Sequence, residues 1–118
     1  MMQGTVKLEI YLPSSCLDAV LEALHEAGAG QVGLYDHVAS WAPVEGCWRP
    51  LPDSDPYDGA VGSLCRGREY KLEMRCPAQN VPQALAAVRA VHPYEEPVIN
   101  VVPLLDAAAF AAEEGHGG

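Results

Sequence analysis

The fold follows from a stretch that occurs twice, Lys-Leu-Glu-Ile-Tyr-Leu-Pro at residues 7–13 and Lys-Leu-Glu-Met-Arg-Cys-Pro at residues 71–77. Four of the seven positions are identical, and in each copy apolar and polar residues alternate up to a final proline. Alternation with a period of two is typical of a strand that buries one face. We therefore expect the two copies to be corresponding strands of one sheet.

Apolar residues at helical spacing follow each copy, which predicts an amphipathic helix after each strand. The first helix is expected to end at Gly28-Ala29-Gly30, because glycine accepts the left-handed backbone of a helix end. Further strands are predicted over residues 33–42 and 97–104, with a short extra strand near 46–51. The two helical stripes consist of Leu17, Val20, Leu21, Leu24 and Ala27, and of Val81, Ala84, Leu85, Val88 and Val91.

The predicted element order is strand–helix–strand–strand–helix–strand. Right-handed crossovers return both helices to one side of the sheet. This predicts an α+β, ferredoxin-like sandwich with a four-stranded antiparallel sheet, two helices on one face, and an extended excursion over residues 43–67 between the second and third strands. We expect one domain over residues 1–105 and a tail over 106–118 that forms a short helix or a frayed end.

The sheet face without helices is expected to be exposed, and exposed sheets with free edges pair readily with other chains. Self-association is therefore the simplest use of this surface. The face is predicted to carry Lys7, Glu9, Tyr11, Lys71, Glu73, Arg75 and His37.

Composition limits the partners of the chain. Among its 118 residues are sixteen acidic and seven basic side chains, a formal net charge of −9. Phosphate backbones and anionic membranes attract basic faces, so we expect neither nucleic acid nor a membrane as a partner. The four cysteines form no Cys-x-x-Cys pair, and the chain begins directly with a strand pattern. Both features favour a cytoplasmic protein with free thiols.

No catalytic constellation is evident, so we expect a protein that is not an enzyme. The sequence contains no nucleophile elbow of the Gly-x-Ser-x-Gly type and no phosphate-binding glycine loop at a helix start. His25-Glu26 resembles the start of a zinc-protease motif, but Ala29 stands where that motif requires a second histidine.

The most distinctive segment is His-Pro-Tyr-Glu-Glu-Pro at residues 92–97, whose two prolines restrict the backbone between them. It fits a rigid helix-to-strand connection with a buried Tyr94, a ligand or metal site that uses His92 with Glu95 or Glu96, or a contact between subunits. Imidazole, carboxylate and thiolate ligands suit zinc or copper. The candidate metal ligands are His37, His92, Glu95 and Cys47.

An ordered series of motifs resembles a known module. The motifs are Gly28-Ala29-Gly30-x-x-Gly33-x-Tyr35, Ser40-Trp41, Pro50-Leu51, Pro56-Tyr57-x-Gly59-x-Val61-Gly62-x-Leu64 and the segment at 92–97. Together they look like the PII-like/CutA-like domain inserted in bacterial Nif-three-like proteins, which are often labelled GTP cyclohydrolase I type 2 homologues. The resemblance spans nearly the whole chain and suggests a free-standing copy of that module.

The resemblance implies a homo-oligomer, trimeric by analogy, with a regulatory or ligand-sensing role and a small-molecule or metal ligand. The alternative it implies is a divalent copper- or zinc-binding protein of CutA type. It transfers no catalytic residue, because the dinuclear metal site of Nif-three-like proteins lies in a flanking domain. PII proteins bind nucleotides at the corresponding excursion, where this chain offers only Arg49, Arg66 and Arg68. The candidate ligand or interface residues are His92, Tyr94, Glu95, Glu96, Tyr35, Gly59 and Gly62.

Overall fold

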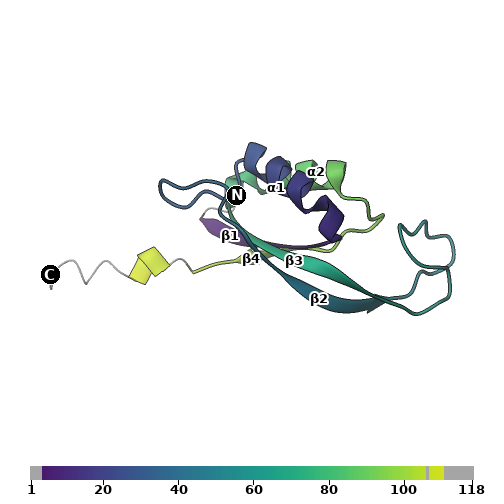
Figure 1. Cartoon of the computed structure of the whole chain (residues 1–118). Helices are drawn as coiled ribbons and strands as arrows, with labels where there is room; N and C mark the ends of the chain where they lie inside the picture. The colour runs from purple at the N-terminus through teal and green to yellow at the C-terminus, as the bar shows by residue number, and fades with distance from the viewer. Residues whose placement is uncertain (1–3, 106, 111–118) are drawn as a thin grey trace, which may run out of the picture.

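The computed structural model describes residues 4–105 and 107–110, and this part of the chain holds four strands and two α-helices in the predicted order (Figure 1). They are β1 (Thr5–Leu12), α1 (Leu17–Glu26), β2 (Ser40–Trp48), β3 (Cys65–Pro77), α2 (Val81–Val91) and β4 (Ile99–Pro103). Short 3-10 helices form Ser14–Cys16, Ala78–Asn80 and Ala107–Phe110. The last of these agrees with the short helix expected in the tail, and the rest of 106–118 lies outside the described residues.

The strands form one antiparallel sheet in the order β2-β3-β1-β4, and both helices cover the same face of it (Figure 1). This architecture confirms the predicted ferredoxin-like sandwich. Within the described residues, no helix has the length and apolar character needed to cross a membrane.

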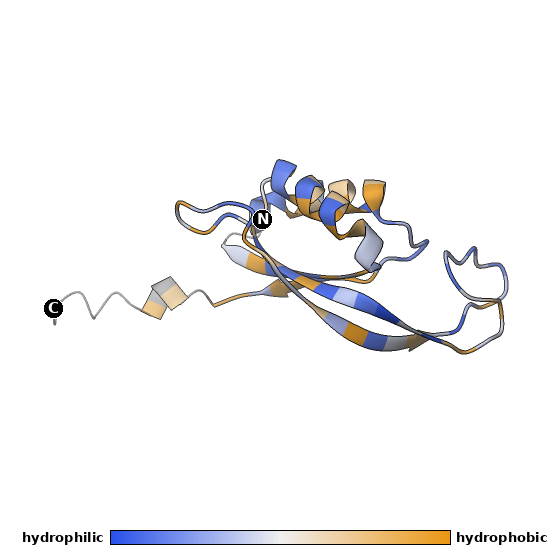
Figure 2. Cartoon of the chain, in the orientation of Figure 1, coloured by the Kyte–Doolittle hydropathy of each residue, from blue (hydrophilic) through white to orange (hydrophobic). Residues whose placement is uncertain are grey.

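The core lies between the sheet and the helices. Along β1 every second side chain is buried, and apolar and polar residues alternate along the strands in Figure 2. The helices contribute the buried side chains of the predicted stripes, including Leu24 of α1 and Val88 of α2. The largest side chains that are less than 2% exposed are Leu8, Ile10, Leu12, Leu24, Leu72, Val6, Val20, Val88 and Cys76.

The repeated stretches lie side by side at the centre of the sheet. In the β1–β3 pairing, Glu9 lies opposite Glu73. Two positions away along the strands, Lys7 lies opposite Arg75 on one side of this pair, and Tyr11 lies opposite Lys71 on the other. Paired residues of an antiparallel ladder point to the same side. All six therefore share the face turned away from the helices, as predicted, and we refer to it as the open face.

The second strand differs from the prediction. Residues 33–39 are not part of the sheet, and β2 instead runs from Ser40 to Trp48, which includes only the first half of the segment predicted as a separate strand near 46–51. Gly33 and His37 both have positive φ, which an extended strand cannot accommodate. Gly30 N donates to the Arg75 carbonyl, and Val38 N donates to the Gly30 carbonyl, both at 2.8 Å, so residues 31–37 form a closed loop.

Because of this loop, His37 does not lie on the open face, contrary to the prediction.

The extent of β2 was not evident from the sequence, because Pro43 and Gly46 within this strand are typical of turns. A proline is tolerated here because β2 is an edge strand with β3 as its neighbour.

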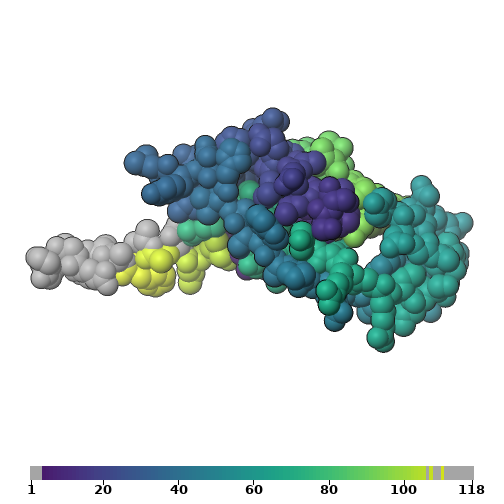
Figure 3. All heavy atoms as spheres, in the orientation of Figure 1, coloured from purple at the N-terminus to yellow at the C-terminus, as the bar shows by residue number. Residues whose placement is uncertain are grey.

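The β2–β3 hairpin extends past the helices (Figures 1 and 3). β3 begins at Cys65 and not near residue 71, so its first half pairs with the second half of β2 beyond the core. We refer to residues 49–64, which connect these strands, as the hairpin tip. The molecule measures 61 × 27 × 24 Å with a radius of gyration of 17.1 Å, whereas a compact domain of this length has about 13.5 Å.

Candidate functional site

The segment at residues 92–97 begins with a histidine that is 7% exposed. His92 Nε2 lies 2.7 Å from the Tyr11 carbonyl oxygen, and Nδ1 accepts a hydrogen bond from Tyr94 N at 3.2 Å. Since Nδ1 accepts, Nε2 carries the proton and donates to Tyr11. Both ring nitrogens are thus engaged in joining the end of α2 to β1, and a metal at His92 would have to displace one of these bonds.

Tyr94 continues the connection toward the hairpin. Its hydroxyl donates to Glu69 Oε2 at 3.0 Å, and its ring lies 5.7 Å from the Tyr57 ring and 4.7 Å from the His92 ring. Burial of the ring and the bond to Glu69 raise the pKa of Tyr94 far above its usual value. Tyr94 was predicted to be buried and is only partly buried, but it contacts both β3 and the hairpin tip.

Glu95 and Trp48 fix the hairpin tip from two sides. Glu95 Oε1 accepts a hydrogen bond from Asp55 N at 2.8 Å, and Trp48 Nε1 donates to the Asp58 carbonyl at 3.1 Å. Gly59 packs so closely that an added Cβ would lie 2.6 Å from Cys65 Sγ. These hydrogen bonds and the close packing fix the conformation of the tip, although many of its apolar side chains are exposed to solvent. Exposed among them are Leu51 (57%), Tyr57 (57%), Val61 (52%) and Leu64 (67%).

The remaining candidates for ligand or interface contacts are spread over the molecule. Gly62 lies in the hairpin tip and donates its N–H to the Pro50 carbonyl at 2.8 Å. Glu96 is exposed and follows Glu95 directly in the sequence. Tyr35 is 75% exposed in the loop 31–37, which precedes β2 and is not part of the tip. The structure thus gathers His92, Tyr94, Glu95 and Gly59 around the hairpin tip and leaves Tyr35 apart.

Charged side chains fill the middle of the open face and neutralise one another. Lys7 Nζ lies 2.9 Å from Glu9 Oε2 and 3.0 Å from Glu73 Oε2, and Lys71 Nζ lies 3.8 Å from both carboxylates. The hydrogen bonds from Lys7 lower the pKa of Glu9, while those to Glu9 and Glu73 raise the pKa of Lys7. Two positive and two negative charges therefore leave this patch without net charge.

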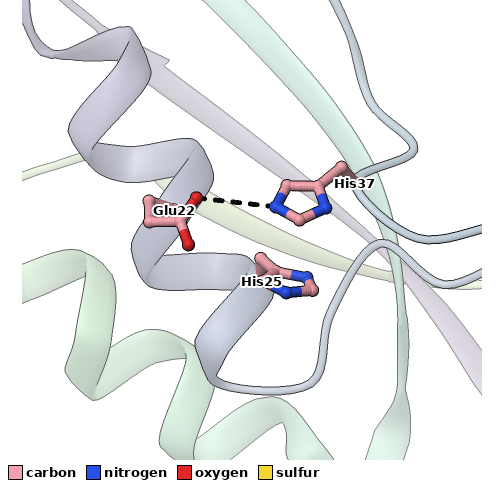
Figure 4. A group of neighbouring side chains, drawn as sticks. All are labelled: Glu22, His25 and His37. Carbon is pink, nitrogen blue, oxygen red and sulfur yellow. Dashed lines mark ion pairs between the residues drawn. The ribbon is translucent and has the colours of Figure 1, made fainter.

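Three potential metal ligands lie together elsewhere, at α1. Glu22, His25 and His37 each offer a ligand atom, and these atoms lie within 4.8 Å of one another (Figure 4). We call them the histidine cluster. His37 Nε2 is 3.5 Å from Glu22 Oε2, and the two imidazole rings stack with centroids 3.6 Å apart.

The predicted metal ligands are not brought together in the described part of the chain. His37 belongs to the histidine cluster, His92 is bonded to Tyr11, and Glu95 is bonded to the hairpin tip. Cys47 lines a shallow groove on the hairpin beside Arg66 and Arg68. Sequence reasoning missed Glu22 and His25. Their i, i+3 spacing on a helix, which places them on one side of it, was the available signal.

The chain is similar to known proteins, although no family model matches it. The GTP cyclohydrolase 1 type 2 homolog of Mycobacterium tuberculosis is 39% identical over 100 residues, which are 84% of this chain and 26% of the relative. The chain therefore spans about a quarter of the length of the curated relatives it matches.

Solved structures also include proteins that are similar to this chain. A Bacillus cereus protein related to NIF3 superposes with a TM-score of 0.77 at 29% identity, over 88% of this chain and 26% of that one. The periplasmic divalent cation tolerance protein CutA from Archaeoglobus fulgidus gives a TM-score of 0.65 over 94% of this chain and 97% of that one, at 16% identity. The last likeness concerns the fold alone. Together these findings confirm the resemblance predicted from the motifs.

Proposed function

We propose that this chain, which is homologous to one segment of the Nif3-like GTP cyclohydrolase 1 type 2 homologs, is a self-associating PII-like module without enzymatic activity of its own. Its role is regulation or ligand sensing in the cytoplasm, and by analogy with the fold its assembly is a trimer. The observation that supports self-association best is the open face, which continues into the exposed hairpin tip.

The open face is suited to burial against another copy. Covering a charged group is costly unless its partner remains beside it. Here Lys7 and Lys71 are already paired with Glu9 and Glu73 within one chain, so a second copy can cover the patch without separating charges. The β3 register places apolar or small residues of the edge strand on the same face, namely Ala42, Val44 and Trp48.

The hairpin tip projects at one end of the molecule (Figure 3), and its exposed apolar side chains add to this surface. Contiguous exposed apolar side chains on a soluble domain mark interaction surfaces. Bonds from Glu95 and Trp48 hold the tip before any partner arrives, which lowers the conformational entropy lost on binding. A rigid projecting hairpin of this kind is fitted to reach across a neighbouring copy.

A charge at Ala42 tests the proposed face. Ala42 is exposed on β2 and lies opposite Lys71, so Ala42→Glu gains a favourable neighbour within the monomer but places a carboxylate in the interface. We expect the variant to shift the population toward the 12.6 kDa monomer in light scattering. Ala86→Glu, on the exposed side of α2, makes the same change away from the sheet and should leave the assembly intact. Equal masses for both variants would exclude the open face as the interface.

The second candidate function is divalent-metal binding of CutA type. The A. fulgidus structure is described as a divalent cation tolerance protein, and the histidine cluster favours such a role here. Because His92 and Glu95 are engaged in other bonds, this candidate depends on residues of α1 and of the loop 31–37.

A further inference from the structure

The histidine cluster is assembled by two elements within one chain. Glu22 and His25 lie one turn apart on α1. The positive φ values of Gly28 and Gly30 turn the backbone after this helix, and the bond between Val38 N and the Gly30 carbonyl closes the loop that carries His37. The loop thereby returns His37 to the side of α1 that presents Glu22 and His25 (Figure 4).

The separations are compatible with a shared metal ion. Two ligands at about 2.0–2.1 Å from a tetrahedral ion lie about 3.3 Å apart. Glu22 Oε2 and His37 Nε2 are already 3.5 Å apart, and all three ligand atoms lie within 4.8 Å. The side chains of Glu22 and His37 are 60% and 48% exposed, so rotation of a partly exposed imidazole can supply the remaining approach.

His37 is oriented by a second carboxylate. Its Nδ1 lies 2.8 Å from Asp36 Oδ1, which leaves Nε2 directed toward Glu22. Metal-binding histidines commonly hold one ring nitrogen on a carboxylate in this way while the other nitrogen binds the ion. His37 also adopts φ of 56°, an uncommon backbone for a residue other than glycine, and strained positions of this kind cluster at functional sites.

We propose that Glu22, His25 and His37 form a binding site for a transition-metal dication of the zinc and copper class, with Asp36 as the residue that positions His37. Two imidazoles and one carboxylate suit Zn²⁺ and Cu²⁺, whereas Ca²⁺ and Mg²⁺ select oxygen ligands. Three protein ligands leave at least one coordination position to solvent. A net charge of −9 also attracts cations to the chain as a whole.

The site is complete within one chain and therefore does not depend on self-association. The Ala42→Glu variant should bind zinc as the wild type does. Failure of zinc binding would leave the proposed assembly unaffected, and failure of the assembly would leave the zinc site unaffected.

Zinc titration of the reduced 118-residue chain by calorimetry tests the proposal. We expect one Zn²⁺ per chain, and a loss of affinity of at least about tenfold in both His25→Ala and His37→Ala. Asp36→Asn should weaken binding by about tenfold, because the imidazole then loses its orienting carboxylate. In ¹⁵N spectra of the wild type, the ring nitrogens of His25 and His37 should shift on saturation with zinc. Melting of the metal-free variants checks that their fold is retained.

Two controls separate this site from adventitious binding. Glu26→Gln removes a carboxylate from the next exposed position of the same helix end, and His116→Ala removes the histidine of the tail. Both should bind zinc with wild-type affinity. Zinc binding that persists in His25→Ala and His37→Ala, or that is lost in His116→Ala, would overturn the proposal, as would the absence of binding by the wild type.

Discussion

His92 and His37 illustrate how the surroundings of a histidine decide its role. Each lies between a helix and the next strand, and each was a candidate metal ligand. His92 is buried with both ring nitrogens bonded to the protein, whereas His37 is half exposed, with Nε2 facing another candidate ligand. We therefore expect His92 to stabilise the fold and His37 to bind metal.

Substitution of His92 tests this division of roles. His92→Ala leaves the Tyr11 carbonyl without its donor, which should lower the free energy of unfolding by about 1–3 kcal/mol. His92→Gln, whose amide can donate in place of Nε2, should recover part of this loss. Urea denaturation measures both, and calorimetry should show unchanged zinc affinity in His92→Gln. A stable His92→Ala protein that no longer binds zinc would reverse the assignment.

Tyr94 should make stability depend on alkaline pH. Its pKa is raised in the folded state by burial and by the bond to Glu69, from an ordinary value of 10.0. A raised folded-state pKa contributes stability that is fully present below about pH 10 and is lost as pH rises toward the folded-state value. The difference in free energy of unfolding between wild type and Tyr94→Phe should therefore shrink above about pH 10. A difference that stays constant from about pH 8 to pH 11 would contradict this.

The two glycines of the hairpin tip should respond differently to alanine. Both have positive φ, 97° at Gly59 and 84° at Gly62, so each Gly→Ala change carries backbone strain of about 1–2 kcal/mol. At Gly59 the new Cβ also meets Cys65 Sγ at 2.6 Å and Trp48 Nε1 at 3.1 Å, while at Gly62 no such atom lies within 4 Å. Hydrogen exchange of the Trp48 indole N–H should therefore be faster in Gly59→Ala than in Gly62→Ala. Equal exchange rates would show that the tip is not anchored through Trp48.

At the level of elements, the sequence was sufficient to predict those strands and helices whose apolar residues recur at a regular local spacing. The strand β1 and both helices follow from residues spaced by two or by three and four positions, and the structure agrees closely with them. The strand β2 could not be found in this way, because Pro43 and Gly46 are tolerated only through its position at the edge of the sheet. That position is a property of the assembled sheet and not of the segment.

The candidate sites show the same limit. The segment at 92–97 stood out through its prolines, and its contacts with Tyr11, Glu69 and Asp55 agree with the rigid connection considered from the sequence. The histidine cluster did not stand out, because it exists only after the loop 31–37 folds back over α1. Local spacing identified neither the fold of that loop nor the partner of His37.

At the scale of the whole molecule, four parts of the chain have separate proposed tasks. The open face and the hairpin tip serve self-association, the segment at 92–97 holds the tip in place, and the histidine cluster on the helical side binds metal. Because α1 lies on the opposite face from the paired charges of Lys7 and Glu73, an assembly through the open face leaves the cluster accessible.

Sedimentation equilibrium of the wild-type protein tests the central claim, self-association, most directly. Measured over micromolar concentrations at neutral pH, the mass should equal three times 12.6 kDa and should not decline on dilution within that range. A mass of 12.6 kDa at every concentration would contradict the account, because the open face and the hairpin tip would then have no second copy to cover them.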